Sequence, residues 1–155
     1  MKYRYLLIDN DNTLMDFHAA EHAALREALT EAGIEPTDAV CARYSAINDA
    51  LWKALERGET THAALKIARF AQLLEEYPAE NVCAPRLALR YSHYLGTHAD
   101  LMPGAEAFLR RLHGQMKIVL VSNGDSVIQR NRLFRCVFTP LLDNIVISSE
   151  KGVSK

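Results

Sequence analysis

The chain has 155 residues, of which 49% are hydrophobic and 24% are charged, and its formal net charge is −1 at pH 7. A chain of this length and composition is typical of a globular protein that buries a hydrophobic core without needing disulfides or structural metals. A net charge so close to zero argues against binding to nucleic acid or to an anionic membrane surface, because both depend on an excess of basic side chains.

Three short apolar runs, at residues 5–8, 117–121 and 144–147, are predicted to be strands of a parallel sheet, and the last two are rich in β-branched residues. Continuous apolar runs of this length suit strands that are buried on both faces. The first run is too short for a signal peptide or a membrane span. Polar residues follow each run, beginning with Asp9, Ser122 and Ser148. Ligands bind outside the carboxyl ends of parallel strands, so we expect these polar residues to surround a site.

The long segment between the first two runs is rich in Ala and Leu and is interrupted by glycine and proline. Its pattern predicts helices at about 18–32, 37–56, 61–76 and 85–95, and another helix is expected at 105–113. The segment is far longer than a crossover between parallel strands requires. We therefore expect an α/β fold, with a discontinuous Rossmann-like core at 1–15 and 103–155 and an inserted all-helical cap at 16–102.

The cysteines and the basic residues give no sign of a specialised site. The three cysteines, Cys41, Cys83 and Cys136, are dispersed and odd in number, which is typical of reduced thiols in a cytosolic protein. A cytoplasmic location is therefore expected. Two basic clusters and one further pair are interpreted as parts of solvated helix faces: Arg110 with Arg111, Arg130 with Arg132 and Arg135, and Lys66 with Arg69.

The segment Asp9-Asn10-Asp11-Asn12-Thr13 carries the pattern with the clearest chemical meaning. A carboxylate at a strand end can attack phosphorus and form an aspartyl-phosphate. A second carboxylate two residues later can protonate the leaving oxygen and then activate water. Carboxylates also bind Mg²⁺ together with a substrate phosphate. Ser122 and the backbone N–H groups that follow the second strand are suited to bind phosphoryl oxygens.

Together these segments resemble the motifs of the haloacid dehalogenase (HAD) superfamily. Its first motif, an apolar strand followed by Asp-x-Asp-x-Thr, is matched by residues 5–13. Its second motif, a strand that ends in Ser or Thr, is matched by residues 118–122, and its third, Glu-x-Gly-x-x-Lys, by residues 150–155. The helical segment corresponds to the inserted cap of that superfamily. The motifs occur in the expected order and the resemblance covers the whole chain.

The resemblance implies a Mg²⁺-dependent phosphohydrolase that acts on a small-molecule phosphate ester. In this reading Asp9 is the nucleophile, Asp11 is the general acid and base, and both hold the metal. Lys155 would offset the charge at the nucleophile. The residues expected to bind the substrate phosphate are Thr13, Ser122, Asn123 and Gly124. The second aspartate favours cleavage of P–O bonds over C–halogen bonds, since dehalogenases of the superfamily generally lack it.

Further segments resemble a branch of cytosolic 5′-nucleotidases that act on nucleoside monophosphates, including pyrimidine ones. These segments are residues 12–17, 48–52, 102–105, 122–124 and 145–155. Sugar-phosphate phosphatases, phosphoglycolate phosphatases and β-phosphoglucomutase-like enzymes share the main motifs and stay as alternatives.

The sequence departs from the superfamily pattern at two places. Asn12 stands where Gly or Glu is common, and because Asn tolerates turn geometry we expect little functional consequence. The fourth motif, an acidic loop after another strand, supplies a further Mg²⁺ ligand in the superfamily and has no match before Lys155. We therefore expect a truncated form whose first strand has an unpaired edge, with weak or no activity and a tendency to form a homodimer. A non-catalytic binding module with a HAD-like pocket is the opposing hypothesis.

Two metal-binding patterns compete with this reading. His18-Ala19-Ala20-Glu21-His22 matches a zinc-peptidase signature, with both histidines on one helix face. No third zinc ligand is evident, and the reading leaves Asp9 and Asp11 unexplained. Asp9 also begins an EF-hand-like pattern, but Leu14 and Ala20 occupy the positions that need Gly and Glu, so that reading fails.

Overall fold

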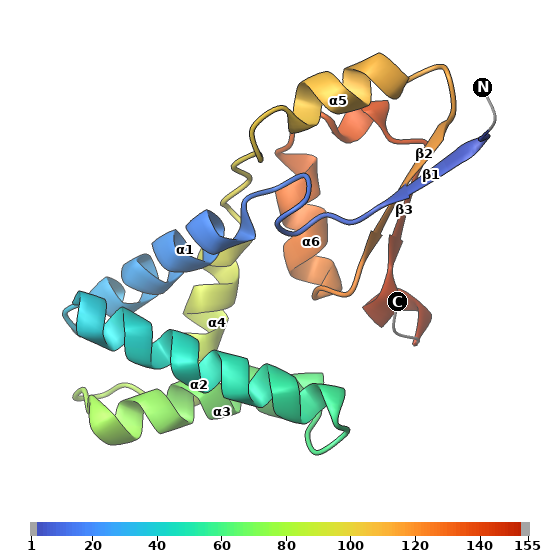
Figure 1. Ribbon diagram of the computed structural model, residues 1–155. Helices are drawn as coiled ribbons and strands as arrows, with labels where there is room; N and C mark the ends of the chain where they lie inside the picture. The colour runs from blue at the N-terminus through green and yellow to red at the C-terminus, as the bar shows by residue number, and fades with distance from the viewer. Residues whose placement is uncertain (1–2, 153–155) are drawn as a thin grey trace. The chain divides into compact units, whose positions relative to one another are not determined.

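The computed structural model describes residues 3–152, and within them three strands form one parallel sheet (Figure 1). The strands are β1 (Tyr5–Ile8), β2 (Lys117–Ser122) and β3 (Asn144–Ile147), and β2 lies between the other two. In the register, Ile8 pairs with Leu120 and Ile147 pairs with Ser122. The carboxyl ends of all three strands therefore meet at one edge of the sheet, as the sequence predicts.

One face of β1 is exposed, so the prediction that this strand is buried on both faces is wrong. Tyr5 and Leu7 are 66% and 69% exposed, whereas Leu6 and Ile8 are half-buried against the core. Within residues 3–152, β1 pairs only with β2. The apolar run reports the hydrophobicity of both faces, but it does not report whether another element covers each face.

Around the sheet, the helices α5 (Ala105–Leu112) and α6 (Ser126–Phe134) supply apolar side chains to one core. The short 3₁₀ helix η1 (Thr139–Leu141) precedes β3, and the single-turn helix α7 (Ser148–Lys151) follows it. Both α5 and α6 present an apolar face inward, because their hydrophobic residues recur at helical spacing. The fully or nearly fully buried core side chains include Leu14, Met15, Leu109, Ile118, Leu120, Leu133 and Phe138.

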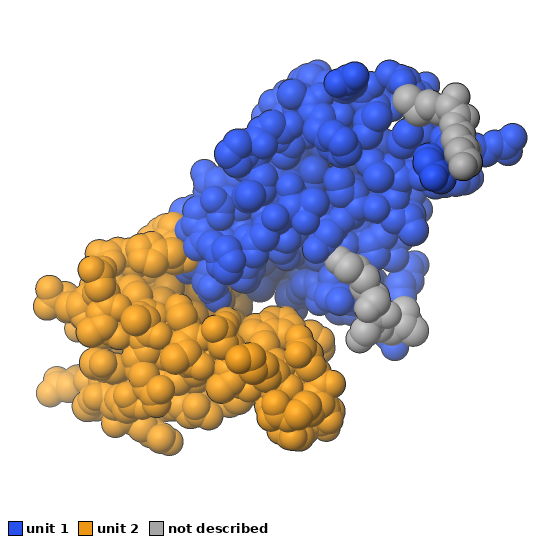
Figure 2. All heavy atoms as spheres, in the orientation of Figure 1, with its two compact units in different colours: residues 1–21, 95–155 blue, residues 22–94 orange. Residues whose placement is uncertain are grey.

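The chain divides into two compact units, one of residues 1–21 with 95–155 and the other of residues 22–94 (Figure 2). The second unit is shorter than the predicted insertion at 16–102, because the connecting residues on both sides group with the sheet. Its helices come from α1 (Phe17–Glu31), α2 (Asp38–Glu56), α3 (His62–Glu76) and α4 (Ala84–Leu95). These bounds confirm the four predicted helices to within a residue at each end.

Threonine side chains cap the N-termini of two of these helices. Thr37 Oγ1 accepts a hydrogen bond from the Val40 N–H (3.3 Å), and Thr61 Oγ1 accepts one from the Ala64 N–H (3.2 Å). Both threonines have extended backbone angles and so act as N-caps. Since a cap satisfies one of the unpaired N–H groups at a helix start, it explains why α2 and α3 begin where they do.

A buried arginine lies at the centre of the second unit, where a solvated helix face was predicted. Arg69 is only 6% exposed, and its guanidinium lies 4.6 Å from the centre of the Tyr91 ring and 5.3 Å from that of Phe70. Its Nη1 donates to Asn48 Oδ1 (3.1 Å). The prediction for Arg69 is therefore wrong, because cation–π contacts and one amide oxygen stabilise it away from water.

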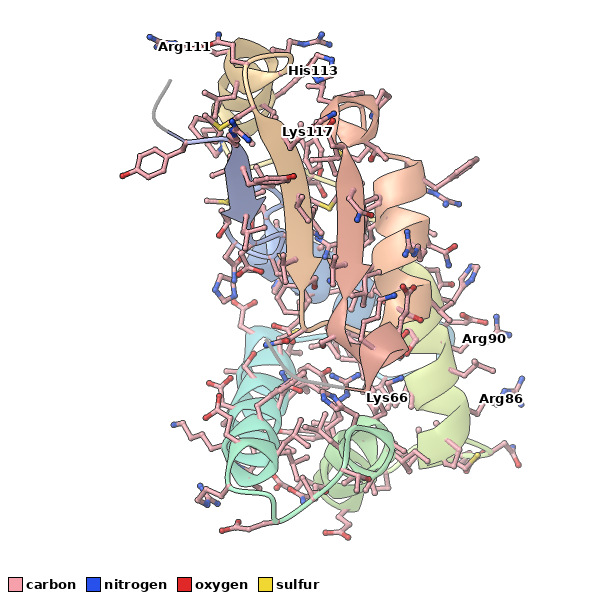
Figure 3. The ribbon with its side chains drawn as sticks, turned by 90° about the vertical axis from the view of Figure 1, so that its right-hand side faces the viewer. Lys66, Arg86, Arg90, Arg111, His113 and Lys117 are labelled. Carbon is pink, nitrogen blue, oxygen red and sulfur yellow. The ribbon has the colours of Figure 1, made fainter. Side chains whose placement is uncertain are left out.

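Other charged residues of this unit do lie at the surface. Figure 3 labels Arg86 and Arg90 on α4, whose side chains point outward, and Arg90 pairs with Glu31 (2.9 Å). Lys66 on α3 is half-buried.

All three cysteines are free thiols, as the sequence predicts. No helix within residues 3–152 is both long enough and apolar enough to cross a membrane.

Candidate active site

The loop after β1, which carries Asp9 and Asp11, is wound tightly around one carbonyl group. Asn10 O accepts hydrogen bonds from the N–H groups of Thr13 (3.2 Å), Leu14 (2.8 Å) and Met15 (3.0 Å). Asn12 completes the turn with φ 57°, in the left-handed region that Asn tolerates better than most residues. The loop therefore has a defined shape, and Asn12 suits it as expected.

The same loop is joined directly to the start of α1. Asn12 Oδ1 accepts hydrogen bonds from the N–H groups of Phe17 (3.1 Å) and His18 (3.3 Å). Asp16 Oδ1 accepts one from the Ala19 N–H (2.9 Å), and the Asp16 N–H donates to Asp100 O (2.9 Å). The two segments that connect the units therefore pair with each other beside Asp11.

The turn after β2 contains the predicted phosphate-binding residues Ser122, Asn123 and Gly124. Ser122 is buried, and its Oγ accepts a hydrogen bond from the Gly124 N–H (3.0 Å). Asn123 is exposed. Asp125 then caps α6, its Oδ1 accepting from the Val127 N–H (3.1 Å) and the Ile128 N–H (3.2 Å). In this conformation the Gly124 N–H is occupied by Ser122, so binding a phosphoryl oxygen there requires that bond to open.

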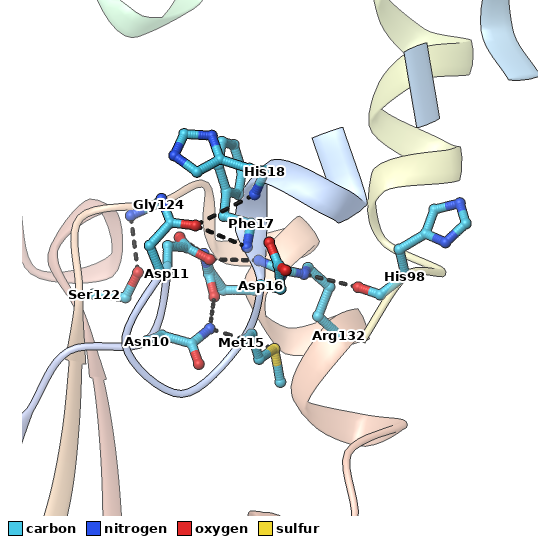
Figure 4. A network of polar contacts seen from close by, with 12 residues as sticks. Asn10, Asp11, Met15, Asp16, Phe17, His18, His98, Ser122, Gly124 and Arg132 are labelled. Carbon is cyan, nitrogen blue, oxygen red and sulfur yellow. Dashed lines mark hydrogen bonds and ion pairs between the residues drawn. The ribbon is translucent and has the colours of Figure 1, made fainter. Parts of the chain in front are cut away.

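Two side chains of α6 hold both carboxylate oxygens of Asp11. Figure 4 labels Asp11 and one of the two, Arg132. Arg132 Nη1 donates to Asp11 Oδ1 (2.5 Å), and Gln129 Nε2 donates to Asp11 Oδ2 (2.6 Å). Gln129 Oε1 in turn accepts from Asn10 Nδ2 (2.5 Å). Asp11 is thereby linked to the helix that follows the second motif, and Asn10, Gln129 and Arg132 are all buried.

The prediction that Arg132 belongs to a solvated helix face is wrong, since its side chain is fully buried. Arg132 Nε donates to His98 O (2.9 Å), and the guanidinium lies 5.7 Å from the centre of the Phe17 ring. The helical spacing carries a signal that could have located it. Arg132 lies four residues after the buried Ile128, on the inner face of α6, whereas Arg130 and Arg135 are exposed.

Gly124 leaves the space that Gln129 occupies. A Cβ atom built on Gly124 would lie 2.4 Å from Gln129 Nε2 and 2.9 Å from its Cγ. Neither distance is compatible with van der Waals contact. The glycine after Ser122 therefore allows Gln129 to pass behind the turn and to reach both Asn10 and Asp11.

The start of the predicted third motif also reaches the turn after β2. Ser149 Oγ donates to Gly124 O (3.3 Å), and Arg130 makes two hydrogen bonds to Glu150 (3.0 and 2.9 Å). The hydrogen bond from Arg130 lowers the pKa of Glu150 below its ordinary value. Lys155, the predicted charge partner of the nucleophile, lies outside the described residues.

The donor groups near Asp9 are of the kind that Mg²⁺ prefers. Mg²⁺ is bound through one or two protein carboxylates, waters and substrate phosphate, so the Asp9 carboxylate and the Asp11 backbone carbonyl fit its chemistry. Within residues 3–152, no group of three or more His, Cys, Asp or Glu side chains could hold a metal ion. The zinc site suggested by His18 and His22 therefore finds no third ligand there.

Comparison with known proteins agrees with this architecture. Residues 3–155 match the family model of the haloacid dehalogenase-like hydrolases. The HAD-hydrolase YfnB of Bacillus subtilis is 36% identical over 154 residues, which are 99% of this chain and 65% of the relative. The pyrimidine 5′-nucleotidase PynA of Streptococcus pneumoniae is 33% identical over 156 residues, which are 100% of this chain and 65% of the relative.

A crystal structure of B. subtilis YfnB bound to magnesium superposes with a TM-score of 0.93 at 35% identity. The alignment covers 100% of this chain and 68% of that one. The chain thus spans about two thirds of the length of the curated relatives that it matches. With a family model that matches almost every residue and a fold shared with YfnB, the chain belongs to the haloacid dehalogenase-like hydrolases.

Proposed function

We propose that the protein is a Mg²⁺-dependent phosphomonoester hydrolase that works through an aspartyl-phosphate. The observation that carries this proposal is the convergence of Asp9 and Asp11, at the end of β1, with the turn from Ser122 to Gly124 at the end of the adjacent strand. Gln129 lies between the two loops, bonded to Asp11 and in contact with Gly124. Carboxylates beside a polar turn at the end of a parallel sheet suit a substrate phosphate.

In the proposed reaction an Asp9 carboxylate oxygen attacks the phosphorus and forms a P–O bond as the bond to the leaving oxygen breaks. Asp11 transfers a proton to that oxygen, so the alcohol departs neutral. Asp11 then takes a proton from a water molecule that attacks the aspartyl-phosphate, which frees inorganic phosphate and restores Asp9. A bound Mg²⁺, held by the Asp9 carboxylate and the Asp11 carbonyl, would neutralise charge on the phosphoryl oxygens.

The remaining predicted residues have supporting roles in this proposal. Thr13, Ser122, Asn123 and Gly124 would bind the phosphoryl oxygens through hydroxyl, amide and backbone N–H groups. Lys155 would offset negative charge at the nucleophile during attack. The side chain of Ser122 already faces the turn that would receive the phosphate, since it accepts from the Gly124 N–H.

A nucleoside 5′-monophosphate is the proposed substrate class. Support comes from PynA, which is named as a pyrimidine 5′-nucleotidase and is 33% identical to this chain. Asp11 also favours a phosphate ester over a haloacid, because a leaving alcohol needs a proton and a leaving halide does not. A cytoplasmic location stays a prediction.

Release of phosphate from nucleoside monophosphates and from sugar phosphates, measured with Mg²⁺ and again with excess chelator, tests the proposal. We expect faster release from the pyrimidine nucleotides, loss of release on chelation, and recovery when Mg²⁺ is restored. Asp9→Asn should abolish turnover. Asp38→Asn is the matched control, because the Asp38 side chain is fully exposed on α2. Turnover that survives in Asp9→Asn would refute the nucleophile, and preference for sugar phosphates would refute the substrate class.

A further inference from the structure

We infer that Arg132 and Gln129 are positioning residues, which fix the Asp11 carboxylate so that it can exchange a proton with the leaving oxygen. The inference rests on the proposed role of Asp11 as general acid and base. It assigns a role to two residues outside the sequence motifs, both on the inner face of α6.

The contacts determine the orientation of the carboxylate as well as its location. Arg132 donates to one oxygen of Asp11 and Gln129 donates to the other, over 2.5 and 2.6 Å. Two donors on two different oxygens restrict rotation about the bond that carries the carboxylate. Each carboxylate oxygen has more than one acceptor site, so each can still bind a proton or a water molecule. The arrangement therefore orients Asp11 without blocking it.

Arg132 is itself held in place by its surroundings. Its side chain is fully buried, its Nε donates to His98 O (2.9 Å), and its guanidinium lies against the Phe17 ring. The other terminal nitrogen, Nη2, is buried and has no hydrogen-bond partner among residues 3–152. A buried guanidinium is costly unless a nearby anion compensates it, and Asp11 is the carboxylate with which Arg132 pairs. The two charges thus depend on each other.

Gln129 is held by a separate set of contacts. Its Oε1 accepts from Asn10 Nδ2, which leaves the amide only one way to face, with Nε2 toward Asp11. The absence of a side chain at Gly124 leaves room for the amide. Because Gln129 is held by Asn10 and Arg132 by His98 O, substituting each residue gives a separate test of the inference.

The test compares two esters whose leaving groups differ in their need for a proton. p-Nitrophenolate is a stable anion and departs without one, whereas the 5′-alkoxide of a nucleotide needs the proton that Asp11 supplies. The value of kcat/KM reports steps up to the departure of the leaving group, so the shared hydrolysis of the aspartyl-phosphate does not affect it. Substitution of a residue that orients the acid should therefore lower kcat/KM more for the nucleotide than for p-nitrophenyl phosphate.

We expect Arg132→Gln and Gln129→Leu to lower kcat/KM about 100-fold for a nucleoside monophosphate and less than about tenfold for p-nitrophenyl phosphate. Arg135→Gln is the matched control, since it removes an exposed guanidinium, at the end of α6, that donates to Asn131 O. This variant should leave kcat/KM unchanged for both esters.

If the Arg132 and Gln129 variants fold and lose kcat/KM equally for both esters, or lose it for neither, the inference is overturned. The proposed function fails separately, if the unaltered chain hydrolyses neither ester. In that case a double-mutant cycle decides whether Arg132 holds Asp11. We expect Asp11→Asn and Arg132→Gln to give Tm shifts that depart from additivity by about 4 °C or more. Additive shifts would show that Asp11 is not held, and so would overturn the inference.

Discussion

The Asn12 side chain accepts a hydrogen bond from the Phe17 N–H over 3.1 Å, so the loop that carries Asp9 and Asp11 also caps the first helix of the chain. A second hydrogen bond from the His18 N–H reaches the same oxygen. The first turn of a helix has N–H groups without partners inside the helix, and Asn12 satisfies two of them. The geometry of the loop after β1 and the start of α1 are therefore linked through one amide.

Substitution of Asn12 separates two contributions to stability. Asn12 has φ 57°, so Asn12→Ala loses the cap and also places an ordinary residue in the left-handed region. We expect the free energy of unfolding to fall by about 2–3 kcal/mol. Asn12→Gly should lose less, because glycine adopts this conformation freely. Asn12→Asp keeps a side-chain oxygen that can accept the two hydrogen bonds, and Asp also tolerates the left-handed conformation. Its free energy of unfolding should therefore be close to that of the unaltered protein. Urea unfolding measures all three variants, and equal stability of the Ala and Gly variants would contradict the argument.

The ion pair between Lys117 and Asp143 predicts a pH-dependent contribution to stability. Lys117 Nζ lies 2.7 Å from Asp143 Oδ1, and Asp143 Oδ2 accepts from the Ile118 N–H (2.8 Å). Figure 3 labels Lys117 on β2. These bonds, chiefly the one from Lys117, hold the pKa of Asp143 below its ordinary value of 3.8. The stabilisation is therefore complete above that value and is lost as the pH falls through the lower pKa of the folded state.

Asp143→Asn should consequently lower Tm at neutral pH, and the difference from the unaltered protein should shrink once the pH falls below 3.8. The amide still accepts from the Ile118 N–H, so the variant isolates the charge. Lys117→Gln removes the other partner and should show the same convergence in acid. Thermal unfolding followed by circular dichroism across this range measures both variants. A difference that stays constant into acid would exclude Asp143 as its source.

Thiol reactivity should separate Cys83 from the other two cysteines. Cys83 is exposed, whereas Cys41 and Cys136 are buried. Burial raises the pKa of the Cys136 thiol, an effect that outweighs the lowering by its backbone bond and by the charge of Arg132. Since the thiolate is the reactive form, Cys136 should react slowly in the folded protein. We expect one thiol per chain to react rapidly with an aromatic disulfide reagent in the folded protein. This rapid reaction should disappear in Cys83→Ser, and all three thiols of the unaltered chain should react after denaturation. Rapid reaction of Cys83→Ser would contradict the burial of the other thiols.

The elements of this fold could be predicted well because their signals are local. Thr37 and Thr61 precede runs with helical periodicity, and both prove to be N-caps. Helical spacing could have located Arg132 on the inner face of α6, but its pairing with Asp11 could not be predicted, because the two residues lie 121 positions apart in the sequence. Arg69 is similar, since its burial depends on aromatic rings from α2 and α4. A local pattern identifies an arginine on a helix, but the burial of its charge depends on partners brought together by the tertiary fold.

The edge of β1 that has no partner strand within residues 3–152, together with its exposed apolar side chains, predicts self-association. Tyr5 and Leu7 are 66% and 69% exposed on a strand that pairs only with β2 within residues 3–152. An apolar strand with a free edge can pair with the same strand of a second copy, with its backbone N–H and C=O groups joined across the interface. We therefore expect dimers whose proportion rises with protein concentration in sedimentation or light-scattering measurements.

Leu7→Lys should weaken this association by placing a charge on the strand, which is how natural edge strands resist pairing. Leu89→Lys is the matched control, because Leu89 is 70% exposed but lies on a helix of the other unit. The control should associate like the unaltered chain, since a helix has no unpaired strand edge to offer. Equal weakening by both substitutions would point to general hydrophobic association and against pairing through β1, and a chain that stays monomeric at all concentrations would refute the dimer altogether.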